Sequence, residues 1–244
     1  QRTYSLATGA YNDIAVFFQT IGIRDSAIFY LNKAIASSTL SNEKEKRINI
    51  YINLADNLAQ NSDFTNATAT YRKALLLSDS LKLQKKYNAP IYLGLSKIYI
   101  DLNNFDQADT YLTLIENQQD SLELYEQFYY LTTRGNYYFN KDEHEKSIPV
   151  YHKLLELTKK YNQIDNRMIA EINLGESHLR LHHLDSAQYY LNNVSDYYFN
   201  QIKNPATSFY LRGLFAYLYL LKNDTKKAEQ LLNQWLKLPY TIQD

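Results

Sequence analysis

Two histidines have the spacing in this sequence that comes closest to a chemical site. His178 and His182 are four residues apart, so on a helix they share one face, a geometry that binds Zn²⁺. No third ligand is identifiable from its spacing, and the chain has no cysteine that would supply a thiolate. His178 also falls where most of the equivalent segments carry an aromatic residue. We therefore expect a structural histidine here and no metal site.

Other catalytic patterns are missing as well. The sequence has no glycine-rich phosphate loop, and its spacing yields no set of serine, histidine and acid. Lys and Arg together number 26, as do Asp and Glu, so no net charge attracts nucleic acid or an anionic membrane. No apolar stretch reaches the roughly 18 residues that a membrane span needs. We expect a non-catalytic chain with no cofactor, no bound nucleic acid and no membrane insertion of its own.

The elements that would position any site form a repeat. When the chain is aligned on the small residue after each short polar turn, it divides into six units of about 40 residues. Each unit carries two runs of apolar and small residues at helical spacing, which predicts one apolar stripe on each of two helices. The aligned small residues are Ala27, Ala67, Ala108, Ser147, Ala187 and Ala228. A bulky residue at these places would push the helices apart.

The first helix of each unit has its own small residue, where it must approach the second helix closely. These are Ala15, Ala55, Ser96, Gly135, Gly175 and Ala216. The pattern predicts an all-α fold of six antiparallel helix–turn–helix units in a single domain over residues 1–244. The units cover approximately residues 4–40, 43–81, 88–118, 121–161, 165–200 and 205–239.

Polar and proline residues mark the expected helix ends. Asn42 and Asp120 each precede a Glu by three residues, which is typical of a capping box at the start of a helix. Pro90 and Pro205 are expected in the first turn of a helix, where proline costs no hydrogen bond. Pro149 is expected inside a helix, which it should kink.

The spacing of small and aromatic residues resembles the tetratricopeptide repeat. The second unit, with Ala55 and Ala67, matches that family almost fully, and the later units match in outline, with Arg134, Glu171 and Arg212 as departures. The resemblance covers the whole chain, although the family's usual period is about 34 residues. It implies a right-handed superhelical solenoid whose concave wall consists of the first helices. Long-period members are similar to the repeat arms of bacterial signalling and transcription regulators.

By this resemblance, a protein or an extended peptide segment binds in the concave groove. The side chains expected to face it are Asn12, Asn49, Asn53, Asp56, Lys97, Tyr129, Asn136, Asn173, Glu176, Arg180 and Tyr217. The asparagines offer a donor and an acceptor on each amide, so a ladder of them would hold a peptide by its backbone. The alternative is that they are ordinary surface residues of an asparagine-rich chain.

The resemblance implies a peptide-binding scaffold that serves as the sensor or docking domain of a larger signalling or transcription-regulatory protein. A carbohydrate-binding helical lipoprotein of the cell envelope is the alternative, favoured if exposed tyrosines form a flat patch. An enzyme of an unrecognised type is a further rival. The sequence leaves the compartment open between an exported or periplasmic part of a membrane-linked protein and a cytoplasmic one. Asp-Ser-Ala and Asp-Ser-Leu triplets, which some envelope bacteria glycosylate, give a slight lean to export.

The last predicted helix, over residues 226–238, carries more apolar residues than one inward stripe can bury. The final unit of a repeat array has no neighbour to cover its outer face. We therefore expect self-association, or cover by further sequence, through the surface around Trp235.

Overall fold

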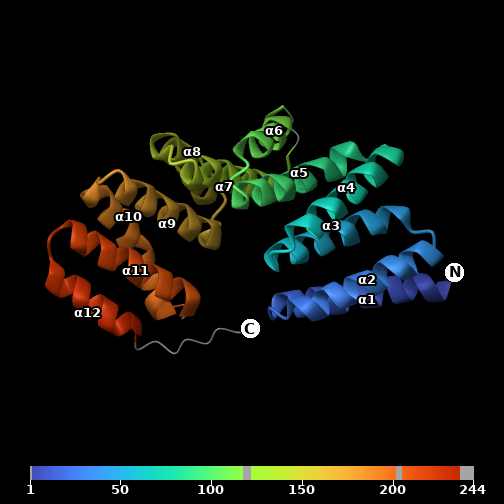
Figure 1. Cartoon of the computed structure of the whole chain (residues 1–244), viewed down its shortest axis with the longest axis horizontal. Coiled ribbons are helices and arrows are strands. Elements are labelled where there is room, and N and C mark those ends of the chain that lie inside the picture. Colours follow the sequence, from blue (N-terminus) through green and yellow to red (C-terminus); the bar gives the residue numbers. More distant parts are fainter. Residues whose placement is uncertain (1, 118–121, 202–204, 237–244) are drawn as a thin grey trace. The chain divides into compact units, whose positions relative to one another are not determined.

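A computed structural model describes residues 2–117, 122–201 and 205–236 of the chain. Those residues form twelve α-helices and a short π-helical segment, and they contain no β-strand (Figure 1). They group into two compact units, residues 1–130 and residues 131–244. The predicted all-α class is confirmed, while the extent of a single domain and the handedness of a superhelix stay predictions.

The first unit holds six helices and the start of a seventh. They are α1 (Arg2–Thr20), α2 (Arg24–Leu40), α3 (Lys44–Gln60), α4 (Phe64–Ser80), α5 (Gln84–Asp101), α6 (Phe105–Glu116) and the beginning of α7 (Leu124–Asn140). From α1 to α6, each helix packs against the next along the chain. In addition, α3 contacts α5, so the first helices of two neighbouring repeats lie side by side.

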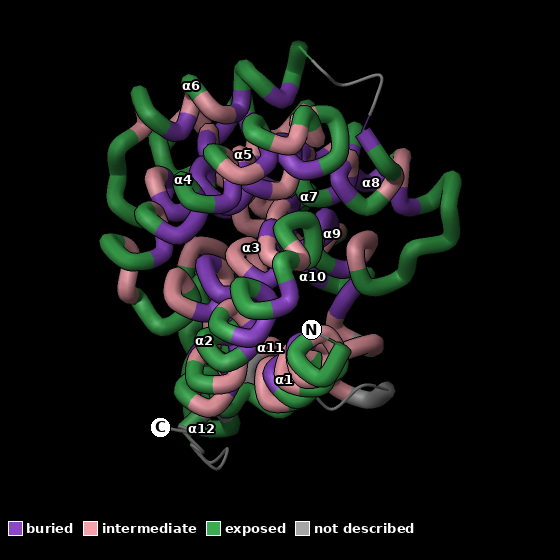
Figure 2. Tube along the Cα trace, turned by 90° about the vertical axis from the view of Figure 1, so that its right-hand side faces the viewer, coloured by how far each residue is buried: buried purple, intermediate pink, exposed green. Residues whose placement is uncertain are grey.

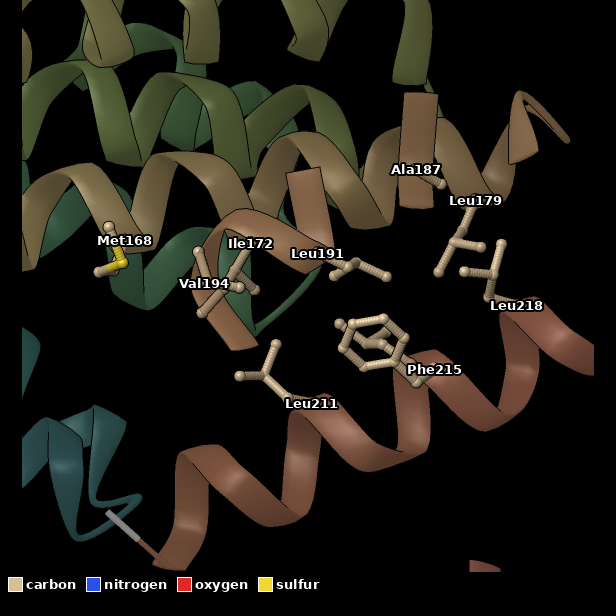
Figure 3. Packing of buried hydrophobic residues seen from close by; sticks show 10 residues of the cluster. Met168, Ile172, Leu179, Ala187, Leu191, Val194, Leu211, Phe215 and Leu218 are labelled. Carbon is tan, nitrogen blue, oxygen red and sulfur yellow. The ribbon is translucent and has the colours of Figure 1, made fainter. Parts of the chain in front are cut away.

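The second unit begins at Leu131, inside α7. It holds α8 (His144–Lys160), α9 (Ile164–Arg180), α10 (Leu184–Asp196), η2 (Tyr197–Gln201), α11 (Pro205–Leu221) and α12 (Thr225–Leu236). From α8 to α12, consecutive α-helices contact each other, and α9 contacts α11. Figure 3 shows the core between α9, α10 and α11, where Leu191 and Val194 face Leu211 and Phe215. None of the described helices is long and apolar enough to cross a membrane.

The 40-residue period follows from the lengths of the helices and turns. Helices α2, α3, α4, α8 and α9 each have 17 residues. Three-residue turns separate them from the helices that follow, so two helices and two turns make one repeat. The middle residue of such a turn has a positive φ, as at Gly22, Asn42, Ser62, Lys82, Asn103, Asp142, Asn162, His182 and Asn223. This left-handed residue is the usual way to end one helix tightly before the next begins.

Two of the expected helix starts are wrong. Asn42 does not cap α3, because it holds the left-handed turn position with φ 60° and Glu43 precedes the helix instead. Pro90 lies inside α5 rather than in its first turn, since α5 already begins at Gln84. Pro205 does open α11, and α8 continues through Pro149 to Lys160. The proposed cap Asp120 lies outside the described residues.

The small residues behave as the repeat pattern predicts. All twelve small residues, six on the first helices and six on the second helices, are buried. The six on the second helices, Ala67 and its equivalents, are at most 1% exposed. Figure 2 shows such buried positions recurring along the helices. The fit is tight, because a Cβ added at Gly135 would lie 2.2 Å from the Tyr151 ring and one at Gly175 would lie 2.8 Å from Leu191. This close packing explains why small residues recur at the same place in each repeat.

Candidate functional site

The first unit contains a pocket of about 620 Å³ that is built mainly from the first helices of its repeats. Three of the predicted groove residues, Asp56 on α3, Lys97 on α5 and Tyr129 on α7, line it together. Its remaining lining residues are Gln19, Ile52, Ala59, Gln60, Ser62, Phe64, Tyr71, Pro90, Leu93, Gly94, Asp101 and Tyr125. A volume of this size is typical of sites that enclose a small ligand or one long side chain.

A buried tyrosine from α4 forms part of the pocket wall. Tyr71 is 1% exposed, and its hydroxyl donates a hydrogen bond to the carboxylate of Asp56. A Cβ at residue 94 would lie 2.0 Å from the Tyr71 hydroxyl oxygen, so glycine at this place on α5 leaves the room that the tyrosine needs. Burial and the neighbouring carboxylate raise the pKa of Tyr71 far above its usual range.

The charged groups of the pocket are two carboxylates and one ammonium. Burial raises the pKa of Asp56, while the Tyr71 hydrogen bond and the Lys97 charge act in the opposite direction. Burial also raises the pKa of Asp101, and Lys97 again lowers it. Burial, together with the charges of Asp56 and Asp101, raises the pKa of Tyr129 to about 12. When both carboxyls are ionised, the pocket carries one more negative than positive charge.

The amides predicted for the first unit lie outside the lining of this pocket. Asn53 donates to Asn12 between α3 and α1 at 3.5 Å, and Asn49 donates to the Tyr87 hydroxyl at 3.4 Å. Both distances are at the long end of the range for hydrogen bonds. Asn12 and Asn53 are half-buried and Asn49 is exposed. These weak internal contacts leave the amides able to bind a ligand, but they are not part of the enclosed site.

A second hollow of about 380 Å³ lies between α9 and α11 in the second unit. The predicted residues Glu176, Arg180 and Tyr217 all line it. Arg180 donates to Glu176 at 3.4 Å, and the Tyr210 hydroxyl also donates to this carboxylate. Burial first, and then the hydrogen bond to Glu176, raises the pKa of Tyr210. In this hollow the carboxylate already has both a cationic and a hydroxyl partner.

The other two predicted amides of the second unit differ from each other. The Asn136 side-chain oxygen accepts a hydrogen bond from the Tyr151 hydroxyl at 2.7 Å, which ties α7 to α8. That oxygen is therefore engaged in holding the helix pair together. Asn173 is half-buried on α9 and is not among the residues that line the second hollow.

The suggested histidine pair is not on one helix face. His182 has φ 58° in the turn after α9, so the i, i+4 geometry with His178 does not form. His178 instead lies beside His183, with 3.4 Å between their Nδ1 atoms, and stacks on Tyr190. Burial lowers the pKa of His178, and the neighbouring histidines add to the effect. In the described part of the chain, no group of three or more His, Cys, Asp or Glu residues could hold a metal ion.

Sequence reasoning missed the role of Tyr71, Gly94, Asp101 and Tyr125 in the first pocket. Asp101 carried a usable signal, because it follows Lys97 by four residues and so lies on the same face of its helix. Tyr125 likewise precedes Tyr129 by one helical turn. Tyr71 and Gly94 carried none, since their contact joins helices of different repeats.

Comparison with known proteins agrees with the helical repeat. Residues 48–80 and 89–115, which fall in helices α3 to α6, match the family model described as tetratricopeptide repeat. The structure of BtubC (BKLC) from P. vanneervenii is similar, with a TM-score of 0.63 and 16% identity over 96% of this chain and 90% of that one. A tetratricopeptide repeat protein from Parabacteroides merdae has a TM-score of 0.52 and 15% identity over 97% and 95% of the two chains. No curated protein matches the sequence.

Proposed function

We propose that the first unit binds an extended segment of a partner protein, because residues 48–80 and 89–115 match the tetratricopeptide repeat model and the fold is similar to that of a solved tetratricopeptide repeat protein. Repeats of this type generally serve as non-catalytic scaffolds for protein–protein interaction. The observation that carries the proposal is the pocket of about 620 Å³ on the first helices, where Asp56, Lys97 and Tyr129 come together. An extended segment would lie along α3 and α5 and place one side chain in this pocket.

The lining of the pocket suits this role. Ile52 and Phe64 supply apolar surface beside the charged groups, and Tyr125 and Tyr129 are 58% and 44% exposed. Apolar walls with a few polar groups are typical of recognition sites, and partly exposed tyrosines are frequent anchors at protein interfaces. The amides of Asn12 and Asn53 would add contacts to the backbone of the same segment.

Selection from a random dodecapeptide library displayed on phage tests the proposal. Selected peptides should bind the purified chain with a measurable Kd in fluorescence anisotropy. Tyr129→Ala should weaken that binding by about tenfold, as expected for loss of an aromatic anchor. Tyr161→Ala is the matched control, because Tyr161 is 43% exposed but lies in the second unit. Selected peptides that bind both variants equally would contradict a site in this pocket.

We extend the proposal to a sensor or docking arm of a larger signalling or transcription-regulatory protein, on the resemblance to long-period repeats alone. The sequence of the full reading frame tests this extension. An output domain encoded in the same frame would support it, and a frame that encodes repeats only would contradict it.

A further inference from the structure

We infer that the pocket of the first unit receives a basic side chain, the guanidinium or ammonium group of an arginine or lysine in the bound segment. This inference rests on the proposed function and names the chemistry that the pocket selects. The charged and apolar residues that line the pocket support it, independently of the helical-repeat fold.

The carboxylates come from two neighbouring first helices. Asp56 lies on α3 and Asp101 at the end of α5, and both line the pocket with Lys97. Tyr71 donates to one oxygen of Asp56. Among the described residues, neither carboxylate forms a salt bridge, so Lys97 is near them without pairing closely with either. When both carboxyls are ionised, two carboxylates against one ammonium give the pocket a net charge of −1, which a cation would balance.

The rest of the lining fits a long basic side chain. Ile52 and Phe64, which are half-buried, offer apolar surface for the methylene stem, which arginine and lysine commonly bury while the charged head stays polar. The rings of Tyr125 and Tyr129 also line the pocket, and a cation is attracted to the face of an aromatic ring. A guanidinium can also bind a carboxylate through two parallel hydrogen bonds.

The electrostatics point in the same direction. Burial raises the pKa of Asp56 and of Asp101, which means that the ionised form of each carboxyl is less favourable in the free protein than in water. A cation between them would lower both values and stabilise the complex. An acidic side chain would meet two carboxylates, and only Lys97 would attract it.

The second hollow gives a useful contrast. Its carboxylate, Glu176, already accepts hydrogen bonds from Arg180 and Tyr210. A basic ligand would have to compete with Arg180 for that carboxylate. The inference is therefore restricted to the first unit.

The test uses three capped pentapeptides with arginine, citrulline or glutamate between flanking alanines. Citrulline keeps the shape of arginine without its charge. Methyl-labelled isoleucine and leucine report binding by NMR, with Ile52 and Leu93 in the pocket and Ile169 in the second unit as the reference. The arginine peptide should bind with a Kd about tenfold below that of the citrulline peptide, as expected for hydrogen bonds to a charged group. The glutamate peptide should bind most weakly.

Substitutions of Asp56 and Asp101 test whether these carboxylates cause the preference for arginine over citrulline. Asp56→Asn combined with Asp101→Asn should abolish the difference between arginine and citrulline. Asp101→Asn alone should reduce it severalfold, and we expect this variant to keep the wild-type fold because Asp101 is solvent-exposed and its carboxyl is only partly buried. Asp106→Asn is the matched control, because Asp106 is an exposed acid on α6 that does not line the pocket. This control should keep the full preference.

Equal affinities for arginine and citrulline, or a preference unaffected by either Asp variant, would overturn the inference. Other results would separate this inference from the proposed function. Selected dodecapeptides that lack basic residues and still need Tyr129 would leave the scaffold role in place without the cation pocket. An arginine preference together with no selectable dodecapeptide would leave the cation pocket without the scaffold role.

Discussion

The hydroxyl of Tyr71 donates a hydrogen bond to the carboxylate of Asp56, which joins α4 to α3 in the wall of the first pocket. The tyrosine reaches this carboxylate because residue 94 on α5 is a glycine. A contact inside one helix pair thus depends on the next repeat along the chain. The shape of the pocket and the stability of the first unit are therefore linked.

Gly94→Ala should destabilise the protein by about 1–3 kcal/mol, because the added methyl group displaces a fully buried tyrosine. The same change at Gly9 is the control. A Cβ there has no heavy atom within 4 Å, and alanine favours a helix over glycine by about 0.5–1 kcal/mol. Urea unfolding measures both variants. A Gly94→Ala protein as stable as the Gly9→Ala protein would show that Tyr71 does not need this space.

Asp56 should make the stability depend on pH. Its pKa is raised in the folded protein, so the folded state binds the proton more tightly than the unfolded state does. Stability from this group is therefore lost as the pH rises from about 4 through the raised pKa. Asp56→Asn removes the titration, so its stability relative to the wild type should increase between pH 4 and pH 7. Urea unfolding at several pH values measures this, and a difference that stays constant or reverses would contradict the burial of a charged Asp56.

Ala67→Leu should destabilise the protein by about 1–3 kcal/mol through overpacking, since Ala67 is fully buried between helices. Ala69→Leu is the matched control, because Ala69 is exposed on the same helix. The control should unfold at nearly the wild-type urea concentration. An unchanged midpoint for Ala67→Leu would count against the assigned repeat phase.

The last helix should drive self-association. Leu236 is 73% exposed on α12, and Leu231 and Leu232 are half-buried, while the Trp235 side chain lies outside the described residues. Burial of such an apolar side chain contributes about 1.5–3 kcal/mol. Sedimentation velocity should show dimers at high concentration, and Leu236→Lys should shift them to monomers. A wild-type monomer whose tryptophan fluorescence is blue-shifted and protected from a soluble quencher would contradict this prediction.

The helix pairs and their buried faces follow from the sequence because a helix fixes which spacings share a face. Ala27, Ala67 and their equivalents are at most 1% exposed, so their spacing marks the buried face of each second helix without any coordinates. The prediction that Asn42 caps a helix was wrong, because Asn42 holds a left-handed turn position. Asparagine suits both a helix cap and the left-handed conformation, and sequence alone does not distinguish these uses.

Each charged departure from the repeat pattern has a partner in the structure, which lies on the same helix for Glu171 and Arg134 and on another segment for Arg212. Glu171 is 1% exposed and pairs with Arg167 at 3.0 Å. Arg134 lies over the rings of Tyr137 and Tyr138, and Arg212 lies 4.5 Å from the centre of another ring, that of Phe199. For the candidate site, the resemblance to the tetratricopeptide repeat predicted Asp56, Lys97 and Tyr129 as groove residues. That they line one pocket depends on how α3, α5 and α7 pack within the first unit, which the sequence does not give.

The most direct test of the central claim is a crystal structure of the chain with the tightest selected dodecapeptide. We expect an extended peptide along α3 and α5, with a basic side chain held between Asp56 and Asp101. A peptide bound against the second helices α2, α4 and α6, or bound only to the second unit, would contradict it.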